Sequence, residues 1–288
     1  MSKKPTTSRA LIPVGQRKQP ARRKSAVPVV VSATNDTLLP ILGSPLAVAK
    51  LVGTGGEVTR DEGIVLVTGR AYVTRECVVP ADEIYYDRTS RRGGEGPRLG
   101  EADKVSWRDE ATGYECIMLR DTHRGFLSGY VGVPRGHPLW GWDSEAVPPD
   151  LGIEVHGGLT YSRLCQDGPH PARRLAFEAR RICHVPRHPP SYHPTAHATD
   201  HRVEDPHCWW FGFSCDHVYD MVPADDRRPA GCFKAETGAT YRDDGYVVCE
   251  TVVLAAQLRA IADGRAVPPR DVPPPPIGLD PSRGGDRD

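Results

Sequence analysis

Residues 114–133 read YECIMLRDTHRGFLSGYVGV, and this stretch decides the fold class. Two runs rich in strand-forming residues, 114–119 and 126–133, flank a short polar segment that ends in Gly125. This order predicts an antiparallel hairpin, because strand-like runs joined by a short glycine-containing connection favour one. The second strand must stop at Pro134, since proline cannot donate a ladder hydrogen bond.

Outward from the hairpin, further short apolar runs predict more strands. Runs 64–68 and 71–74 predict a strand pair or one bent strand, and runs 153–156 and 209–213 predict one strand each. A modest helix is expected over 172–182, and a long one from an N-cap at Thr240 to about Ala262. Because strands and helices do not alternate, we expect an α+β fold with a mainly antiparallel sheet, one long C-terminal helix and disordered tails.

Composition divides the chain further. Residues 1–35 contain eight Lys or Arg and no acidic residue, so they predict a disordered basic arm. We expect an N-terminal β-rich portion over 36–112 that can pack on a main α+β domain over 113–263. The main domain contains a Pro/His-rich loop at 184–207, and a disordered tail follows over 264–288.

Charge and cysteine spacing exclude several classes of protein. Lys plus Arg (37) equals Asp plus Glu (37), so no overall field attracts a polyanion. The sequence has no apolar run near 20 residues, and its basic N-terminus lacks the apolar segment of a signal peptide. We therefore expect a cytoplasmic protein without a membrane partner. The eight cysteines are spaced singly without a C-x-x-C pair, which indicates buried apolar residues rather than disulfides or a cysteine zinc site.

The histidines are concentrated in the middle of the chain, where any chemistry is expected. All 11 lie between His123 and His217, and the loop 184–207 supplies six of them. Prolines within this loop prevent the regular helix that H-x-x-x-H spacing needs, so we expect adventitious metal binding there and no dedicated site.

Two runs combine strand residues with ionisable ones: WWFGFSCDH at 209–217 and IEVHGGLTY at 153–161. We expect them to face each other. His217 and Asp220, completed by His156 or by His137, then form a candidate ligand set for a divalent metal such as zinc, with an open position for water. The competing interpretation is structural, because histidines at the ends of buried strands often bond to backbone carbonyls, and H-E-x-x-H is absent.

Other residues of the two runs complete the candidate site. Cys215 is a candidate nucleophile beside His217, although neighbours at i and i+2 seldom reach hydrogen-bond distance. The amides of Gly157 and Gly158 can hold a phosphate or carboxylate on a glycine turn. His137, Trp140 and Trp210 are candidate contacts for a small polar or nucleotide-like ligand, stacked on the aromatic rings. The alternative for the tryptophans is plain core packing.

A resemblance covers roughly residues 113–263. The segments 129–138, 155–161, 209–217 and 241–250 resemble a family of uncharacterised proteins carried by bacteriophages, prophages and actinobacteria, which has a run close to W-W-F-G-F-D-C-A-H. This chain differs from the run, with Ser214 in place of the aspartate and Asp216 in place of the alanine. The resemblance implies a phage or mobile-element protein in a bacterial cytoplasm and no particular activity.

Three functions follow as hypotheses. The first is metal-assisted hydrolysis of a small polar or nucleotide-like ligand in a pocket between the two runs. The second is a non-enzymatic module, for ligand sequestration or protein interaction, in which the same residues form a hydrogen-bonded core. The third is weak, non-specific association with nucleic acid through residues 1–35.

Overall fold

The computed structural model describes residues 29–89, 98–166, 174–185, 207–217, 219–223 and 239–270. Most of the predicted basic arm, tail and Pro/His-rich loop lies outside these residues. The last part of the predicted arm is ordered, because residues 29–32 form a strand.

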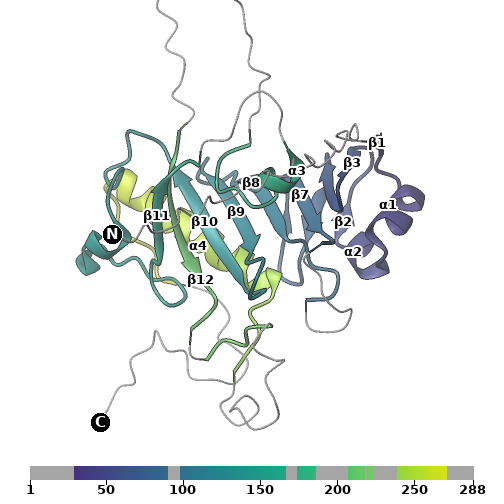
Figure 1. Ribbon diagram of the computed structural model, residues 1–288. Helices are drawn as coiled ribbons and strands as arrows, with labels where there is room; N and C mark the ends of the chain where they lie inside the picture. Colours follow the sequence, from purple (N-terminus) through teal and green to yellow (C-terminus); the bar gives the residue numbers. More distant parts are fainter. Residues whose placement is uncertain are drawn as a thin grey trace, which may run out of the picture.

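One antiparallel sheet of nine short strands dominates the described part of the chain (Figure 1). Its strands, in spatial order, are β1 (Val29–Ser32), β3 (Glu57–Asp61), β4 (Ile64–Thr68), β7 (Ala81–Asp87), β8 (Lys104–Arg108), β9 (Glu115–Arg120), β10 (Leu127–Val133), β12 (Trp209–Ser214) and β11 (Tyr161–Leu164). The predicted hairpin is β9–β10, and β8 pairs with β9 in register, so the sheet continues across residue 112.

A small second sheet and short helices adjoin the large one. The remaining elements are α1 (Asn35–Leu42), α2 (Pro45–Ala49), β2 (Leu51–Val52), β5 (Ala71–Val73), β6 (Val78–Val79), η1 (Ser144–Ala146), η2 (Pro149–Leu151), α3 (Leu175–Glu178) and α4 (Asp244–Ala262). The fold is therefore α+β with a mainly antiparallel sheet and one long C-terminal helix, as the sequence predicts.

Runs 64–68 and 71–74 do not pair with each other, contrary to the sequence prediction. They form β4 in the large sheet and β5 in the small one. The chain changes direction at Gly69, which has a φ of 69°. The Arg70 side chain then donates to the backbone carbonyls of Gly53, Gly55 and Ala33, which fixes the junction between the sheets.

Helix α4 covers one face of the large sheet against β9 and β10 (Figure 1). Its buried apolar residues share a core with alternate residues of the strands, among them Met118, Val131 and Phe213. Asp243 caps the helix by accepting from the Tyr246 amide at 3.0 Å. The predicted N-cap at Thr240 is wrong, because the Thr240 backbone is bonded in an isolated bridge to Asp220.

By length and composition, α4 is also apolar enough to cross a membrane, which the sequence analysis did not anticipate. Among the described residues it is the one helix that passes this test. Its buried residues include Asp244, Glu250 and Gln257, and each of these three makes tertiary polar contacts. These contacts and the packing on the sheet are those of a core helix.

Two other predicted elements are shorter than expected. The predicted helix over 172–182 is reduced to α3 in the described residues, because the Lys104 ammonium binds the carbonyls of Glu178 and Arg181 at 2.7 and 2.8 Å. The predicted strand over 153–156 is absent. The Gln257 side chain instead bonds the amide and the carbonyl of Glu154, both at 3.1 Å, in place of a neighbouring strand.

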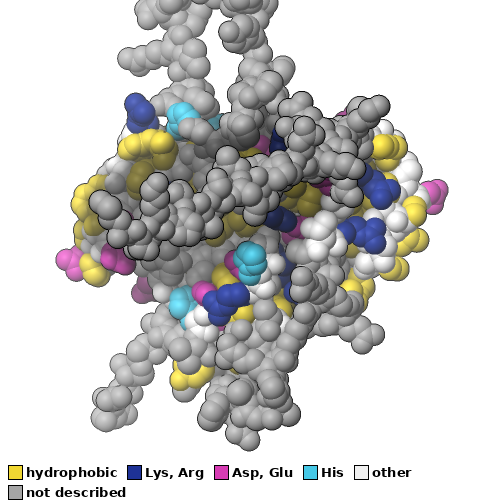
Figure 2. All heavy atoms as spheres, in the orientation of Figure 1, with side chains coloured by type: hydrophobic (Ala, Val, Ile, Leu, Met, Phe, Trp, Pro, Cys, Tyr) yellow, Lys and Arg dark blue, Asp and Glu magenta, His cyan; other side chains and the backbone are white. Residues whose placement is uncertain are grey.

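Positive and negative side chains are interspersed on the face of the molecule in Figure 2. This mixture agrees with the formal net charge of zero.

Candidate metal centre

His156, His217 and Asp220 converge beside the N-terminal end of α4. One ligand atom from each lies within 4.8 Å of the other two. His156 Nε2 is 2.8 Å from Asp220 Oδ2, and His217 Nδ1 is 3.3 Å from the same oxygen. The two imidazole rings meet edge to face, with centroids 5.2 Å apart. The three residues of the predicted ligand set therefore lie together.

Gly157 makes this convergence possible. Its φ of 66° lies in the left-handed region, and a Cβ built on it would be 2.0 Å from His217 Cε1. Only glycine permits both the backbone angle and the close approach of the ring. The expectation that the two runs face each other is thus confirmed. The neighbouring Gly158 has open space around its Cα, and its amide donates to the Val155 carbonyl at 3.0 Å.

Asp220 organises the cluster. Its Oδ2 also accepts from the His217 backbone amide at 2.9 Å, and its Oδ1 accepts from Arg242 Nε at 2.9 Å. Burial would raise the pKa of this carboxyl, but hydrogen bonds from His156, His217 and Arg242 outweigh burial and hold the pKa well below its usual 3.8. The hydrogen bond to Asp220 also raises the pKa of His217 above 6.5. Asp220 is therefore a carboxylate at neutral pH.

His156 is fully buried between Asp220 and Tyr246. Its Nδ1 is 2.9 Å from the Tyr246 hydroxyl, which also accepts from Arg270 Nη2 at 2.8 Å. The His156 tautomer depends on these two partners: when the Tyr246 hydroxyl donates to Nδ1, Nε2–H donates to Asp220 Oδ2, and when Nδ1 donates to the phenol oxygen, Nε2 presents its lone pair to Asp220. The second arrangement is the one that a metal ion between Nε2 and the carboxylate requires.

Four further residues support the cluster and were missed in the sequence: Arg242, Tyr246, Glu250 and Arg270. Tyr246 and Glu250 are four residues apart on α4, so both lie on one helix face, and this polar pair in an apolar helix was an available signal. Glu250 is fully buried; its Oε1 accepts from Arg270, and its Oε2 has no hydrogen-bond partner among the described residues. Arg270 lies in the predicted disordered tail, where no sequence signal marked it.

Cys215 lies next to this region but in a different environment. It is buried on the α4 face of the sheet, and burial raises the pKa of its thiol well above 9.0. A thiol of this kind stays neutral at physiological pH and is a poor nucleophile. Asp216 faces elsewhere, where it accepts from Ser214 Oγ at 2.8 Å and from Arg124 at 2.6 Å. The hydroxyl at position 214 thus holds the carboxylate of position 216.

His137 is not part of the cluster. Its Nε2 is 2.9 Å from the Leu258 carbonyl, its Nδ1 accepts from the Leu139 amide at 3.0 Å, and burial lowers its pKa. Leu258 is twelve residues beyond Tyr246 on α4, which places it about 18 Å farther along the helix axis. Both ring nitrogens therefore have structural partners, as in the competing interpretation of strand-end histidines.

The tryptophans lie at the other end of β12. Trp210 is fully buried on the sheet face opposite α4, where its Nε1 donates to Cys165 Sγ at 3.1 Å. Trp140 contacts Trp209, with ring centroids 6.3 Å apart. Because β12 runs from Trp209 to Ser214, about 17 Å separates its two ends. The structure does not bring these rings to His156 and His217.

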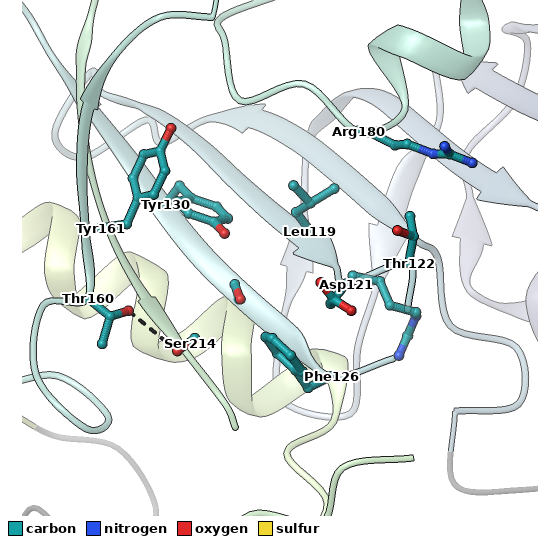
Figure 3. A pocket seen from close by; sticks show the side chains of 11 residues that line it. Leu119, Asp121, Thr122, Phe126, Tyr130, Thr160, Tyr161, Arg180 and Ser214 are labelled. Carbon is teal, nitrogen blue, oxygen red and sulfur yellow. Dashed lines mark hydrogen bonds between the residues drawn. The ribbon is translucent and has the colours of Figure 1, made fainter. Parts of the chain in front are cut away.

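A surface pocket of about 330 Å³ lies on the face opposite α4, which is visible behind the sheet in Figure 3. Thr160 and Ser214 border the pocket and share a hydrogen bond of 3.4 Å. The rings of Tyr130 and Tyr161, also in its lining, meet edge to face with centroids 5.1 Å apart. Arg180, which follows α3 in the chain, lines it as well. None of the residues selected from the sequence as site residues lines this pocket.

Comparisons with protein-family models, with curated proteins and with solved structures gave no significant match for this chain.

Proposed function

We propose that His156, His217 and Asp220 bind a divalent metal ion such as zinc, and that the chain uses it to hydrolyse a small polar or nucleotide-like substrate. One observation carries the proposal: three side chains of ligand type from two separate segments bring their ligand atoms within 4.8 Å of one another. Two imidazoles and one carboxylate are a known catalytic zinc set, which leaves a fourth position for water or substrate.

The distances support a metal of this size. Ligand atoms at tetrahedral positions around zinc lie about 3.4 Å apart when each Zn–N or Zn–O distance is 2.0–2.2 Å. The His217 to Asp220 separation of 3.3 Å is close to this value, and the His156 to Asp220 separation of 2.8 Å requires a small opening. Arg242 on Asp220 Oδ1 and Tyr246 on His156 Nδ1 orient the ligands from the second coordination shell.

Access to such an ion is from the His217 side. The His217 side chain is 26% exposed, whereas those of His156 and Asp220 are almost fully buried. A zinc ion lowers the pKa of a bound water to about 7, so it supplies a hydroxide nucleophile at neutral pH. The protein holds the ion on its buried side and leaves the exposed side for water and a substrate.

The non-enzymatic module is the second candidate. It is favoured by the 2.8 Å His156–Asp220 contact, which an Nε2–H hydrogen bond to the carboxylate satisfies without a metal. In that case the cluster is a polar core that fixes the turn at Gly157 to α4. A cytoplasmic location belongs to both candidates.

Metal content tests the first candidate. The full chain would carry alanine at His188, His193, His197 and His201, all outside the described residues, so that adventitious sites are removed. We expect His217→Ala to lose one equivalent of zinc by elemental analysis relative to this parent. His123→Ala, in the β9–β10 turn, removes a histidine that is not in the cluster; it is the control and should lose none.

Two outcomes would overturn the proposal at different levels. Identical metal content in the parent and in His217→Ala, with both folded, rules out the metal centre. A metal-loaded parent that hydrolyses p-nitrophenyl phosphate and p-nitrophenyl acetate no faster than His217→Ala removes the hydrolytic part and leaves the binding module.

A further inference from the structure

Three cysteines and a histidine gather at the start of β12, on the sheet face opposite α4. The antiparallel register pairs Leu164 of β11 with Trp209 of β12, so the next pair is Cys165 opposite Cys208. The Cys165 amide donates to the Cys208 carbonyl at 3.0 Å, which extends the ladder by this pair. Side chains directly opposite each other project from the same face of a sheet, so the two thiols are neighbours.

A separate segment brings Cys183 and His184 to the same place. The backbone at Ile182 is fixed to Gln166, whose amide donates to the Ile182 carbonyl at 3.2 Å and whose side-chain oxygen accepts from the Ile182 amide at 3.2 Å. His184 Nδ1 then lies 3.4 Å from Cys165 Sγ and 3.5 Å from Cys183 Sγ. The ligand atoms of Cys165, Cys183 and His184 all lie within 4.8 Å of one another.

Cys165 Sγ is the centre of the cluster. It lies within hydrogen-bond reach of the thiols of Cys183 and Cys208. Trp210 Nε1 donates to the same sulfur at 3.1 Å. Ile117, Ile182 and Trp210 form the apolar wall of the cluster. Soft sulfur ligands next to one imidazole, with an N–H donor behind a sulfur, are the environment of a structural zinc ion.

We propose that Cys165, Cys183, Cys208 and His184 form a structural zinc site, independent of the centre at His156. With Zn–S near 2.3 Å and Zn–N near 2.0–2.1 Å, a tetrahedral site places sulfur and nitrogen about 3.6 Å apart. The two S···N separations of 3.4 and 3.5 Å are close to this value. Cys165, Cys183 and His184 already converge, and Cys208, which contacts Cys165, would complete the shell as the fourth ligand. Four protein ligands would give the ion a structural role.

The site would tie distant parts of the chain to the edge of the sheet. β11 is the edge strand, Cys165 follows it, and His184 and Cys208 flank residues 185–207. One ion would therefore close two loops, residues 166–182 between Cys165 and Cys183 and residues 185–207 between His184 and Cys208. Closing both loops removes conformational freedom from the unfolded chain. Sequence reasoning missed the site because successive ligands are 18, 1 and 24 residues apart rather than in C-x-x-C pairs.

Cobalt substitution tests the proposal on the full chain with alanine at His188, His193, His197 and His201. Cobalt bound by three thiolates gives an intense sulfur-to-metal charge-transfer band in the near ultraviolet, which two imidazoles and a carboxylate cannot give. We expect this band in the parent and in His217→Ala. His184→Ala should weaken cobalt affinity at the site at least tenfold, and His184→Cys, which preserves a four-ligand set, should restore it.

Controls separate this site from the other cysteines and from the His156 centre. Cys77→Ser removes a half-buried thiol outside the cluster and should leave the band unchanged. A cobalt-loaded parent without the charge-transfer band would overturn the proposal. So would metal-free folded protein in which Cys165 and Cys183 are found by mass spectrometry as a disulfide. Because the spectrum reports thiolate ligands, its failure leaves the proposal for His156 and His217 intact.

Discussion

The two ends of β12 carry clusters of different chemistry on opposite faces of one sheet. At the end of the strand, His156, His217 and Asp220 are surrounded by charged groups, namely Arg242, Arg270 and Glu250. At its start, three thiols and one imidazole lie against isoleucine and tryptophan. Three protein ligands would leave one coordination position open to water or substrate, whereas four would close the shell around a structural ion. The contrast predicts distinct responses to mutation, chelation and pH.

The largest expected effect is that of Asp220→Ala. The Arg242 side chain is 3% exposed and would lose its buried carboxylate partner, which typically costs about 3–5 kcal/mol of the free energy of unfolding. Asp216→Ala breaks an ion pair with Arg124 whose side chain is 44% exposed, so its cost should be below about 1 kcal/mol. Urea unfolding of both variants measures the difference. Equal losses would mean that Asp220 does not anchor the cluster.

The second largest effect is expected when metal is removed by chelation, and it should distinguish the two clusters. A zinc ion bound at a thousand times its dissociation constant contributes about 4 kcal/mol, so its removal should lower the melting temperature on the order of 10 °C. We expect this drop in the wild-type chain and in His217→Ala when EDTA is added, and a smaller drop in His184→Ala, because a tenfold weaker site stabilises the fold by about 1.4 kcal/mol less. A drop confined to proteins with intact His217 would assign the stabilising ion to the other end of β12.

Glycine substitution isolates the close approach at His217. Gly157 and Gly158 both have positive φ, so alanine at either costs about 1–2 kcal/mol in backbone strain. Only at position 157 does the new Cβ displace the His217 ring; at 158 it meets open space. Gly157→Ala should therefore lose zinc at the His156 centre. Gly158→Ala, which carries a similar cost in backbone strain, should retain the zinc. Loss of zinc in both variants would indicate a role for Gly158 that its surroundings do not explain.

The pH dependence of the metal-free chain has a definite sign. The pKa of His217 is raised in the folded state by its hydrogen bond to Asp220, so protonated His217 stabilises the fold. This contribution is complete below pH 6.5, the usual pKa, and is lost as pH rises through the raised value, by about 1.4 kcal/mol for each unit of pKa shift. The unfolding free energy of wild type minus that of His217→Ala, measured in EDTA, should fall over this window. A difference that grows with pH would contradict the assigned hydrogen bond.

The smallest effect on stability is expected for removal of residues 1–28. These residues precede β1, so their deletion spares the β1–β3 ladder, whereas a cut at residue 35 would remove it. Unfolding by urea should be unchanged within error. If the arm binds nucleic acid, affinity for a non-specific duplex should fall steeply with salt and vanish in the shortened chain. Salt-dependent affinity that persists without the arm would place the contact elsewhere.

Local sequence patterns predicted the elements whose partners are close in the chain. The hairpin β9–β10 and the C-terminal helix follow from strand propensity, a glycine turn and helical periodicity. Two elements that depend on distant groups were predicted incorrectly. Lys104 ends α3 and Gln257 replaces a strand partner for Glu154, and neither contact leaves a mark in the local pattern.

The sequence by itself determined the fold class and the ligand types available, because strand alternation, proline positions and the His-Gly-Gly turn are local properties. It also singled out His156, His217 and Asp220 as one set. Only the tertiary structure decided which ligand atoms meet. The ladder between β11 and β12 sets Cys165 opposite Cys208, and the fold of α4 and the segment after it brings Tyr246 and Arg270 to His156. These contacts join residues far apart in the chain, so no periodicity or spacing could record them.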